Sequence, residues 1–303
     1  MNAANQVYVF PDTMEVIHND LFSRHVNLEE STIQLVHQLL AEVCHPDLKL
    51  PILPKTAQEA LHLSNDPNVT LIQLRKAIEA DALIAARMMA MANSALYCSI
   101  GQTSSLQAAL ARLGMDNIRR TLMTAVLESH ILGGSASRRL DILRQHSILV
   151  AYVSQKLCEE IKLDSEYAFL CGLFHDIGQP ILLSLLPKVA GDQSTSAEQH
   201  ELVDVLHGVA GQRLLSTWNL PELAGIVARR HHSYGSPKKP EGYSQMANVI
   251  AVADRVAYCV GVGEWPLDNE LAAVRALEDL NFEVERCADL MDWASELKSK
   301  LPA

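Results

Sequence analysis

Apolar residues recur along most of this chain at intervals of three and four, which is the spacing of one face of an α-helix. The first such stripe consists of Ile33, Val36, Leu39, Leu40 and Val43. Strand-type alternation is nearly absent. The opening of the chain is the exception, because its Val7-Tyr8-Val9-Phe10 predicts one short strand or an extended arm. The pattern as a whole predicts an all-α protein.

Prolines, glycines and short polar side chains divide this pattern into separate helices. Thr70 and Asp81 are predicted N-caps, and a helix is predicted to end near Gly114. The polar pair Asn93-Ser94 is predicted to end a helix and to hydrogen-bond backbone groups. The helices expected after Gly114 cover about 116–130, 138–161, 166–178, 198–218, 222–232 and 244–262, with one or two more within 268–300.

The stretch Gly133-Gly134-Ser135-Ala136-Ser137 is the best internal boundary, because its composition is that of a flexible connection. We therefore expect an N-terminal arm over 1–30 and a helical subdomain over 31–134. A helical core follows over 135–265, and C-terminal helices over 266–303 pack on that core.

The net charge of the chain argues against two classes of binding partner. With 25 Lys and Arg residues against 36 Asp and Glu residues, the formal net charge of the 303 residues is −11. Nucleic acids and anionic membranes would repel such a chain, so neither is an expected partner. No apolar run approaches the roughly 20 residues of a membrane span, and residues 1–20 lack a signal-peptide pattern. We expect a cytoplasmic protein.

Several predicted helices in the second half place a histidine or an aspartate on an apolar face or at a helix end. These residues are His146, His175, Asp176, His207, His231, His232 and Asp254. A single histidine on an apolar face is more often a hydrogen-bonded core residue than a ligand. A buried carboxylate is harder to explain in that way, because it needs a cation or hydrogen-bond donors nearby.

If these helices pack around one point, they bring imidazoles and carboxylates together. That combination suits a divalent transition metal such as Fe, Mn, Ni or Zn, as one or two ions, and suits calcium poorly. A pair of ions bridged by Asp176 would activate a bound water and hold a phosphate. The alternative is a polar core network of histidines without metal.

The series of histidines and aspartates in this chain resembles the pattern of the HD superfamily of metal-dependent phosphohydrolases. The first half of the chain resembles a narrower group, the HDOD (HD-related output domain) family. The matching stretches are Leu50–Pro54, Ile78–Asp81, Ala92–Tyr97, Ala109–Gly114, Phe174–Gly178 and Trp218–Pro221. Together with the histidines they cover roughly residues 31–262. The resemblance implies an HD-like helical core packed with an N-terminal helical subdomain.

The resemblance also implies a role in bacterial signal transduction, and it makes all seven histidines and aspartates candidate metal ligands, with His175 and Asp176 as candidate catalytic residues. The chain departs from the branch that hydrolyses cyclic dinucleotides (HD-GYP) in three ways. Gln179 stands where that branch has a lysine, the Gly-Tyr-Pro loop is missing, and Ile142 replaces a third-metal acid. These differences argue against hydrolysis of cyclic di-GMP.

Two functions are consistent with these features. The first is a regulatory HDOD protein with an HD-type metal site that acts by binding a signalling protein partner or a nucleotide-type ligand. The alternative is an active metal-dependent phosphohydrolase acting on a nucleotide or a phosphodiester. The missing lysine favours the first function, and the complete set of ligand-type residues favours the second.

Overall fold

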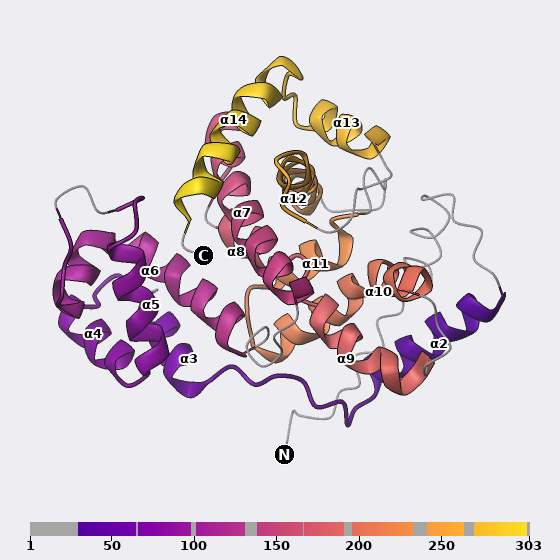
Figure 1. Cartoon of the computed structure of the whole chain (residues 1–303), viewed down its shortest axis with the longest axis horizontal. Helices are drawn as coiled ribbons and strands as arrows, with labels where there is room; N and C mark the ends of the chain where they lie inside the picture. Colours follow the sequence, from indigo (N-terminus) through magenta and orange to yellow (C-terminus); the bar gives the residue numbers. More distant parts are fainter. Residues whose placement is uncertain are drawn as a thin grey trace. The chain divides into compact units, whose positions relative to one another are not determined.

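The regular structure of this chain consists of α-helices throughout the part that is described (Figure 1). The structure is a computed structural model, and it describes residues 30–64, 66–97, 101–130, 138–165, 167–190, 196–232, 241–263 and 270–301. The predicted all-α fold is therefore confirmed. The possible strand at Val7–Phe10 and the Gly133–Ser137 segment lie outside the described residues.

The chain divides into two compact units, each of which collects segments that are far apart in the sequence. Unit 1 comprises Met1–Leu50, Phe174–Val252 and Leu267–Asn281. Unit 2 comprises Pro51–Leu173, Ala253–Pro266 and Phe282–Ala303. The boundary expected between residues 134 and 135 falls on residues that are not described, so the division into 31–134 and 135–265 stays a prediction.

Unit 1 is organised around one long helix, α10 (Ser196–Thr217). This helix packs against α2 (Glu30–Cys44), α9 (Gln179–Ala190) and α11 (Glu222–Arg230). The unit also holds α13 (Glu270–Asp279) and, through Val252, most of α12 (Glu241–Cys259). Leucine and valine side chains of α10 are fully buried, among them Leu202, Val203, Leu206 and Leu214. Burial of this apolar face holds the unit together.

Polar contacts attach α2 to the rest of unit 1. Arg213 on α10 donates hydrogen bonds to the backbone carbonyls of Val43 and His45, at the end of α2. The Val43 carbonyl lies in the last turn of α2, where backbone carbonyls have no partner within the helix. The His45 carbonyl also accepts from the Leu48 amide at 3.1 Å. Lys188 on α9 lies 2.8 Å from the Glu42 carboxylate of α2.

Unit 2 is organised around α6 (Leu106–His130). Its neighbours are α3 (Lys55–Ser64), α4 (Leu71–Glu79), α5 (Ala82–Ala92) and α7 (Arg138–Ile161). The helix α14 (Glu285–Lys300) packs on α7, and α8 (Ala168–Phe174) belongs to this unit up to Leu173. The buried Glu128 carboxylate of α6 joins three of these helices, lying 2.6 Å from Arg87 Nε of α5 and 3.2 Å from Arg144 Nη1 of α7.

Two predicted N-caps are confirmed. Thr70 Oγ1 accepts a hydrogen bond from the Gln73 backbone amide, and Gln73 Oε1 accepts one from the Thr70 amide at 3.0 Å, which completes a capping box at the start of α4. Asp81 accepts hydrogen bonds from two backbone amides at the start of α5. Gly114, with a φ of 71° and a ψ of 167°, is not helical, so α6 consists of two helical segments that meet at a kink there. The helix end predicted near Gly114 is therefore confirmed.

The segment after α8 differs from the prediction. The sequence predicts one helix over about 166–178, whereas α8 ends at Phe174, a turn covers 175–178 and α9 begins at Gln179. Pro180 and Pro187 conceal α9 in the sequence, because proline inside a helix normally ends it. Pro180 is tolerated because it lies in the first turn, where backbone amides have no helical partner.

One described stretch, Ala168–Ala190, is long and apolar enough by composition to span a membrane. Its most apolar 18 residues have a mean hydropathy of 1.5, but 83% of them are buried within the protein. The turn at 175–178 also interrupts it as a helix. Both features are typical of the core of a folded domain.

Asn93 ends α5 and fixes the segment that leads into α6. Its Nδ2 donates to the Thr103 carbonyl at 2.9 Å, and its Oδ1 accepts from the Thr103 amide at 2.8 Å, so the predicted bonding to backbone is confirmed. We expect Asn93→Ala to lower the free energy of unfolding by about 1–3 kcal/mol, because two backbone groups lose their partner. Urea denaturation measures the change, and Ser94→Ala, which loses one local hydrogen bond to Met91, should cost less. An unchanged midpoint for Asn93→Ala would contradict this assignment.

Candidate metal centre

His175 and Asp176 lie in the turn between α8 and α9, and this turn packs directly on α10. Gly178 permits the close approach. A Cβ atom at this position would lie 1.9 Å from the His207 carbonyl oxygen and 2.6 Å from the Gly211 backbone nitrogen. Because no side chain fits there, glycine is required, and the turn brings the Asp176 carboxylate beside the His207 ring.

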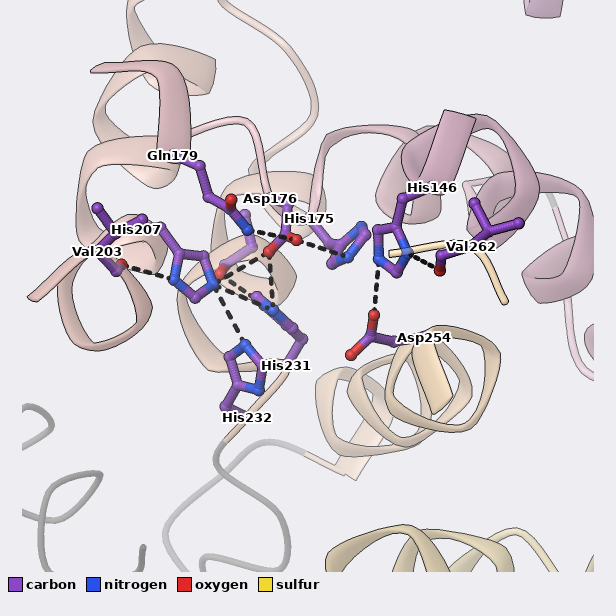
Figure 2. A network of polar contacts seen from close by, with 11 residues as sticks. His146, His175, Asp176, Gln179, Val203, His207, His231, His232, Asp254 and Val262 are labelled. Atoms are coloured by element: carbon purple, nitrogen blue, oxygen red, sulfur yellow. Dashed lines mark hydrogen bonds and ion pairs between the residues drawn. The ribbon is translucent and has the colours of Figure 1, made fainter. Parts of the chain in front are cut away.

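The imidazoles of His207, His231 and His232 gather beside Asp176 (Figure 2). His207 Nε2 lies 3.1 Å from Asp176 Oδ1, and His231 Nε2 lies 3.5 Å from the same oxygen. His207 Nε2 is also 3.3 Å from His231 Nε2 and 3.2 Å from His232 Nε2. One ligand atom from each of the four residues can be chosen so that all lie within 4.8 Å of one another. The turn before α9, the helix α10 and the end of α11 thus supply one compact cluster.

The protons of two of these rings are assigned by their backbone partners. His207 Nδ1 lies 3.0 Å from the Val203 carbonyl oxygen, and His231 Nδ1 lies 2.9 Å from the Ala228 carbonyl oxygen. Since a carbonyl oxygen can only accept, each ring carries a proton on Nδ1, and in a neutral ring Nε2 then presents a lone pair. When both rings are neutral, the two lone pairs face each other and the Asp176 carboxylate. A ring that is protonated at Nε2 as well donates that hydrogen to Asp176 Oδ1 instead.

Burial and charge set the ionisation of the cluster. Burial raises the pKa of Asp176, but charge interactions with His175 and His207 and hydrogen bonds from His207 and His231 outweigh it and hold that pKa well below its usual range. Burial lowers the pKa of His231, and its contact with Asp176 offsets this only in part. A buried, ionised carboxylate beside a neutral imidazole is the protonation state that binds a metal ion.

The donor set fits a divalent transition-metal ion. With the rings neutral, the Nε2 atoms of His207 and His231 and Asp176 Oδ1 are electron-rich atoms 3.1–3.5 Å apart, and a cation among them would remove their mutual repulsion. Zinc-type ions bind imidazole nitrogen and carboxylate oxygen at about 2.0–2.2 Å, which places tetrahedral ligand atoms about 3.3–3.6 Å apart. A metal-bound histidine also commonly donates its other ring N–H to a backbone carbonyl. These residues would hold Fe, Mn, Ni or Zn.

His175 contacts the other oxygen of the same carboxylate. Its Nε2 lies 3.4 Å from Asp176 Oδ2, and its ring is fully buried with its centroid 5.0 Å from that of His231. The structure therefore brings together five of the predicted residues within unit 1: His175, Asp176, His207, His231 and His232.

The other two predicted residues, His146 and Asp254, form a pair within unit 2. Asp254 Oδ1 lies 2.8 Å from His146 Nε2, and both side chains are buried. His146 Nδ1 lies 3.1 Å from the Val262 carbonyl oxygen, and the Tyr258 ring stacks against the imidazole at 4.9 Å. The predicted buried positions of both residues are confirmed, while a two-ion site that uses all seven residues stays a prediction.

The sequence does not reveal one residue of the cluster. Gln179 Nε2 donates a hydrogen bond to Asp176 Oδ2 at 2.7 Å, and its side chain is buried. The sequence marks Gln179 only as the replacement of a lysine. Its three-residue spacing from Asp176 is the signal that could have indicated the contact, but the turn between them was not predicted.

The structure is similar to several solved bacterial structures. An HDOD domain protein of unknown function from Geobacter sulfurreducens gives a TM-score of 0.66 at 21% identity, with 89% of this chain and 97% of that chain covered. A candidate metal-dependent phosphohydrolase from Shewanella amazonensis SB2B gives 0.62 at 22% identity, with 88% and 100% covered. A candidate signal transduction protein from Marinobacter aquaeolei VT8 gives 0.62 at 20% identity, with 98% and 66% covered. At these identities the likeness shows the fold, which is the HD-like helical fold.

A curated relative shares part of the sequence. The chain is 26% identical over 131 residues to the probable nicotinate-nucleotide adenylyltransferase/Ap4A hydrolase of Mycoplasma pneumoniae. The alignment covers 43% of this chain and 36% of that protein, so the chain spans little more than a third of this relative.

A match to a family model identifies the family of this chain. The model of the HDOD domain matches residues 50–234, which is more than half of the chain. The match includes Asp176 and the histidines of unit 1 that surround it, and it agrees with the helical fold of the solved relatives. This chain belongs to the HDOD domain family.

Proposed function

We propose that this protein is a bacterial regulatory HDOD protein of the cytoplasm that binds a divalent transition-metal ion and acts by binding a signalling protein partner or a nucleotide-type ligand. The observation that carries the proposal is the convergence of Asp176 Oδ1 with the Nε2 atoms of His207 and His231. Because each ring donates its Nδ1 proton to a backbone carbonyl, Nε2 of a neutral His207 or His231 is the atom that offers its lone pair to a cation beside Asp176.

An ion in this cluster would connect three elements of unit 1: the turn before α9, the helix α10 and the end of α11. Binding would stabilise the folded unit, by about 2.7 kcal/mol when the free ion is at 100 times its Kd. A regulatory protein can use such a difference in stability between its metal-bound and metal-free forms, because the metal-bound form presents a more rigid surface to a partner.

The comparisons support this proposal at the level of the family. The Marinobacter aquaeolei relative is named for signal transduction, and the Shewanella amazonensis relative for metal-dependent phosphohydrolysis. The Mycoplasma pneumoniae relative is named for two activities on nucleotides, which supports a nucleotide-type ligand. In this chain Gln179 faces Asp176 and carries no positive charge with which to hold a phosphate, which favours binding over hydrolysis.

Metal titration of the purified protein tests the binding half of the proposal. After treatment with a chelator, addition of Mn²⁺, Co²⁺, Ni²⁺ or Zn²⁺ should raise the melting temperature by several degrees, since about 1 kcal/mol shifts a domain of this size by roughly 2–4 °C. His207→Ala should abolish the rise. An equal rise in wild type and His207→Ala would contradict binding at this cluster.

An activity measurement tests the regulatory half. At the same concentration of added metal ion, wild type and Asp176→Asn should show the same background hydrolysis of p-nitrophenyl phosphate, bis(p-nitrophenyl) phosphate and Ap4A. Metal-dependent turnover that Asp176→Asn removes would overturn the regulatory proposal in favour of the phosphohydrolase alternative.

A further inference from the structure

Gln179 holds one oxygen of the Asp176 carboxylate, and this contact divides the carboxylate into two unlike halves. Oδ2 accepts the Gln179 amide at 2.7 Å and faces His175 at 3.4 Å. Oδ1 faces His207 at 3.1 Å and His231 at 3.5 Å. The donor in the Gln179 contact is the amide NH₂ group, because an ionised carboxylate can only accept.

The contact is strong enough to control the orientation of the carboxylate. A hydrogen bond to a charged acceptor is shorter and roughly twice as strong as a neutral one, and here both side chains are buried, away from competing water. Gln179 is the first residue of α9, so its side chain starts from a fixed backbone position. The carboxylate therefore cannot rotate freely about its bond to Cβ.

We propose that Gln179 is a positioning residue that makes Asp176 a one-oxygen metal ligand and limits the unit 1 cluster to a single tightly bound ion. The inference rests on the proposed function, since it needs a metal ion at the cluster. With Oδ2 engaged by the amide, only Oδ1 is directed at the ion, next to the Nε2 atoms of His207 and His231. A second metal ion on the His175 side of the carboxylate would then bind weakly, because Oδ2 already shares its electron density with the Gln179 amide.

Cobalt binding to Gln179→Leu tests the inference, because the visible absorption of Co²⁺ reports the number and arrangement of its ligands. Wild type should bind one Co²⁺ per chain tightly. Gln179→Leu should bind it about 10–100-fold more weakly, which is the usual effect of removing a group that orients a metal ligand. Its absorption should also change, because the freed carboxylate can offer both oxygens to the ion. A purely structural role for Gln179 would leave the spectrum of the bound ion unchanged.

Gln212→Leu provides the matched control. Gln212 also lies in unit 1 and also makes a side-chain hydrogen bond, accepting from Arg229 Nη1 at 3.2 Å, but it does not contact Asp176. This variant should keep both the Co²⁺ affinity and the spectrum of wild type.

The outcomes separate the two proposals. If wild type binds Co²⁺ and Gln179→Leu matches its affinity and spectrum, the positioning role is wrong and the metal site stands. Binding of two equally tight ions to wild type would also overturn the one-ion limit. If wild type binds no Co²⁺ at all, the proposed metal site is wrong, and the role of Gln179 is overturned with it.

Discussion

Replacing Gly178 with alanine should lower the free energy of unfolding by at least about 3 kcal/mol, because the added methyl group would overlap the backbone of α10. The Cβ atom would lie 1.9 Å from the His207 carbonyl oxygen and 2.6 Å from the Gly211 nitrogen. Neither is the end of a flexible side chain, so the clash can be relieved only by separating the 175–178 turn from α10. That movement would also withdraw Asp176 from His207, and metal affinity should fall together with stability.

Gly225→Ala is the matched control for this prediction. A Cβ at Gly225 of α11 would meet Gln212 Cγ at 3.4 Å, which is close to ordinary contact with a side chain that can move. Its effect should stay within about 1 kcal/mol, since the better helix propensity of alanine offsets the tighter packing. Urea denaturation of both variants measures the difference. A Gly178→Ala protein as stable as Gly225→Ala would mean that the turn does not pack on α10 as described.

Asp176→Asn should weaken metal binding by more than about 100-fold while leaving the protein folded. Groups that merely orient a ligand are worth about 10–100-fold, and Asp176 is the charged member of the cluster itself. The asparagine side chain keeps the shape of aspartate and can donate to a neighbouring Nε2 lone pair, so the metal-free fold should lose little stability. Isothermal titration with Zn²⁺ gives the affinity, and the melting temperature of the chelated protein gives the stability.

Asp279→Asn is the control for the loss of one negative charge. Asp279 lies on α13 of the same unit, is exposed, and accepts a hydrogen bond from Asn248 at 3.3 Å. It should bind Zn²⁺ like wild type. Equal affinities for Asp176→Asn and wild type would contradict the assignment of Asp176 as a ligand.

Local sequence signals predicted much of this fold. Thr70 and Asp81 could be predicted as N-caps because threonine and aspartate are preferred just before a helix. In the structure their side chains accept hydrogen bonds from amides two or three residues away. The buried positions of His146 and His207 followed from the apolar stripes of their helices. The sequence does not predict α9, because Pro180 and Pro187 indicate a break in a helix, yet α9 contains both.

The ligand types of the candidate centre were also predictable, but the contacts that orient them were not. The Val203 and Ala228 carbonyls that hold the ring protons are backbone atoms, which no side-chain pattern identifies. The role of Gln179 depends on the turn at 175–178, and that turn depends on the fit of Gly178 against α10. The composition of the two units was likewise hidden, because α2 joins helices more than 130 residues away in the sequence.

X-ray absorption of the cobalt-loaded protein is the sharpest test of a metal ion at Asp176, because it reports which atoms surround the bound ion. We expect nitrogen and oxygen ligands only, with the multiple-scattering pattern of several imidazole rings that weakens in His231→Ala. A shell that contains sulfur, a spectrum without imidazole scattering, or no cobalt retained after dialysis would contradict it.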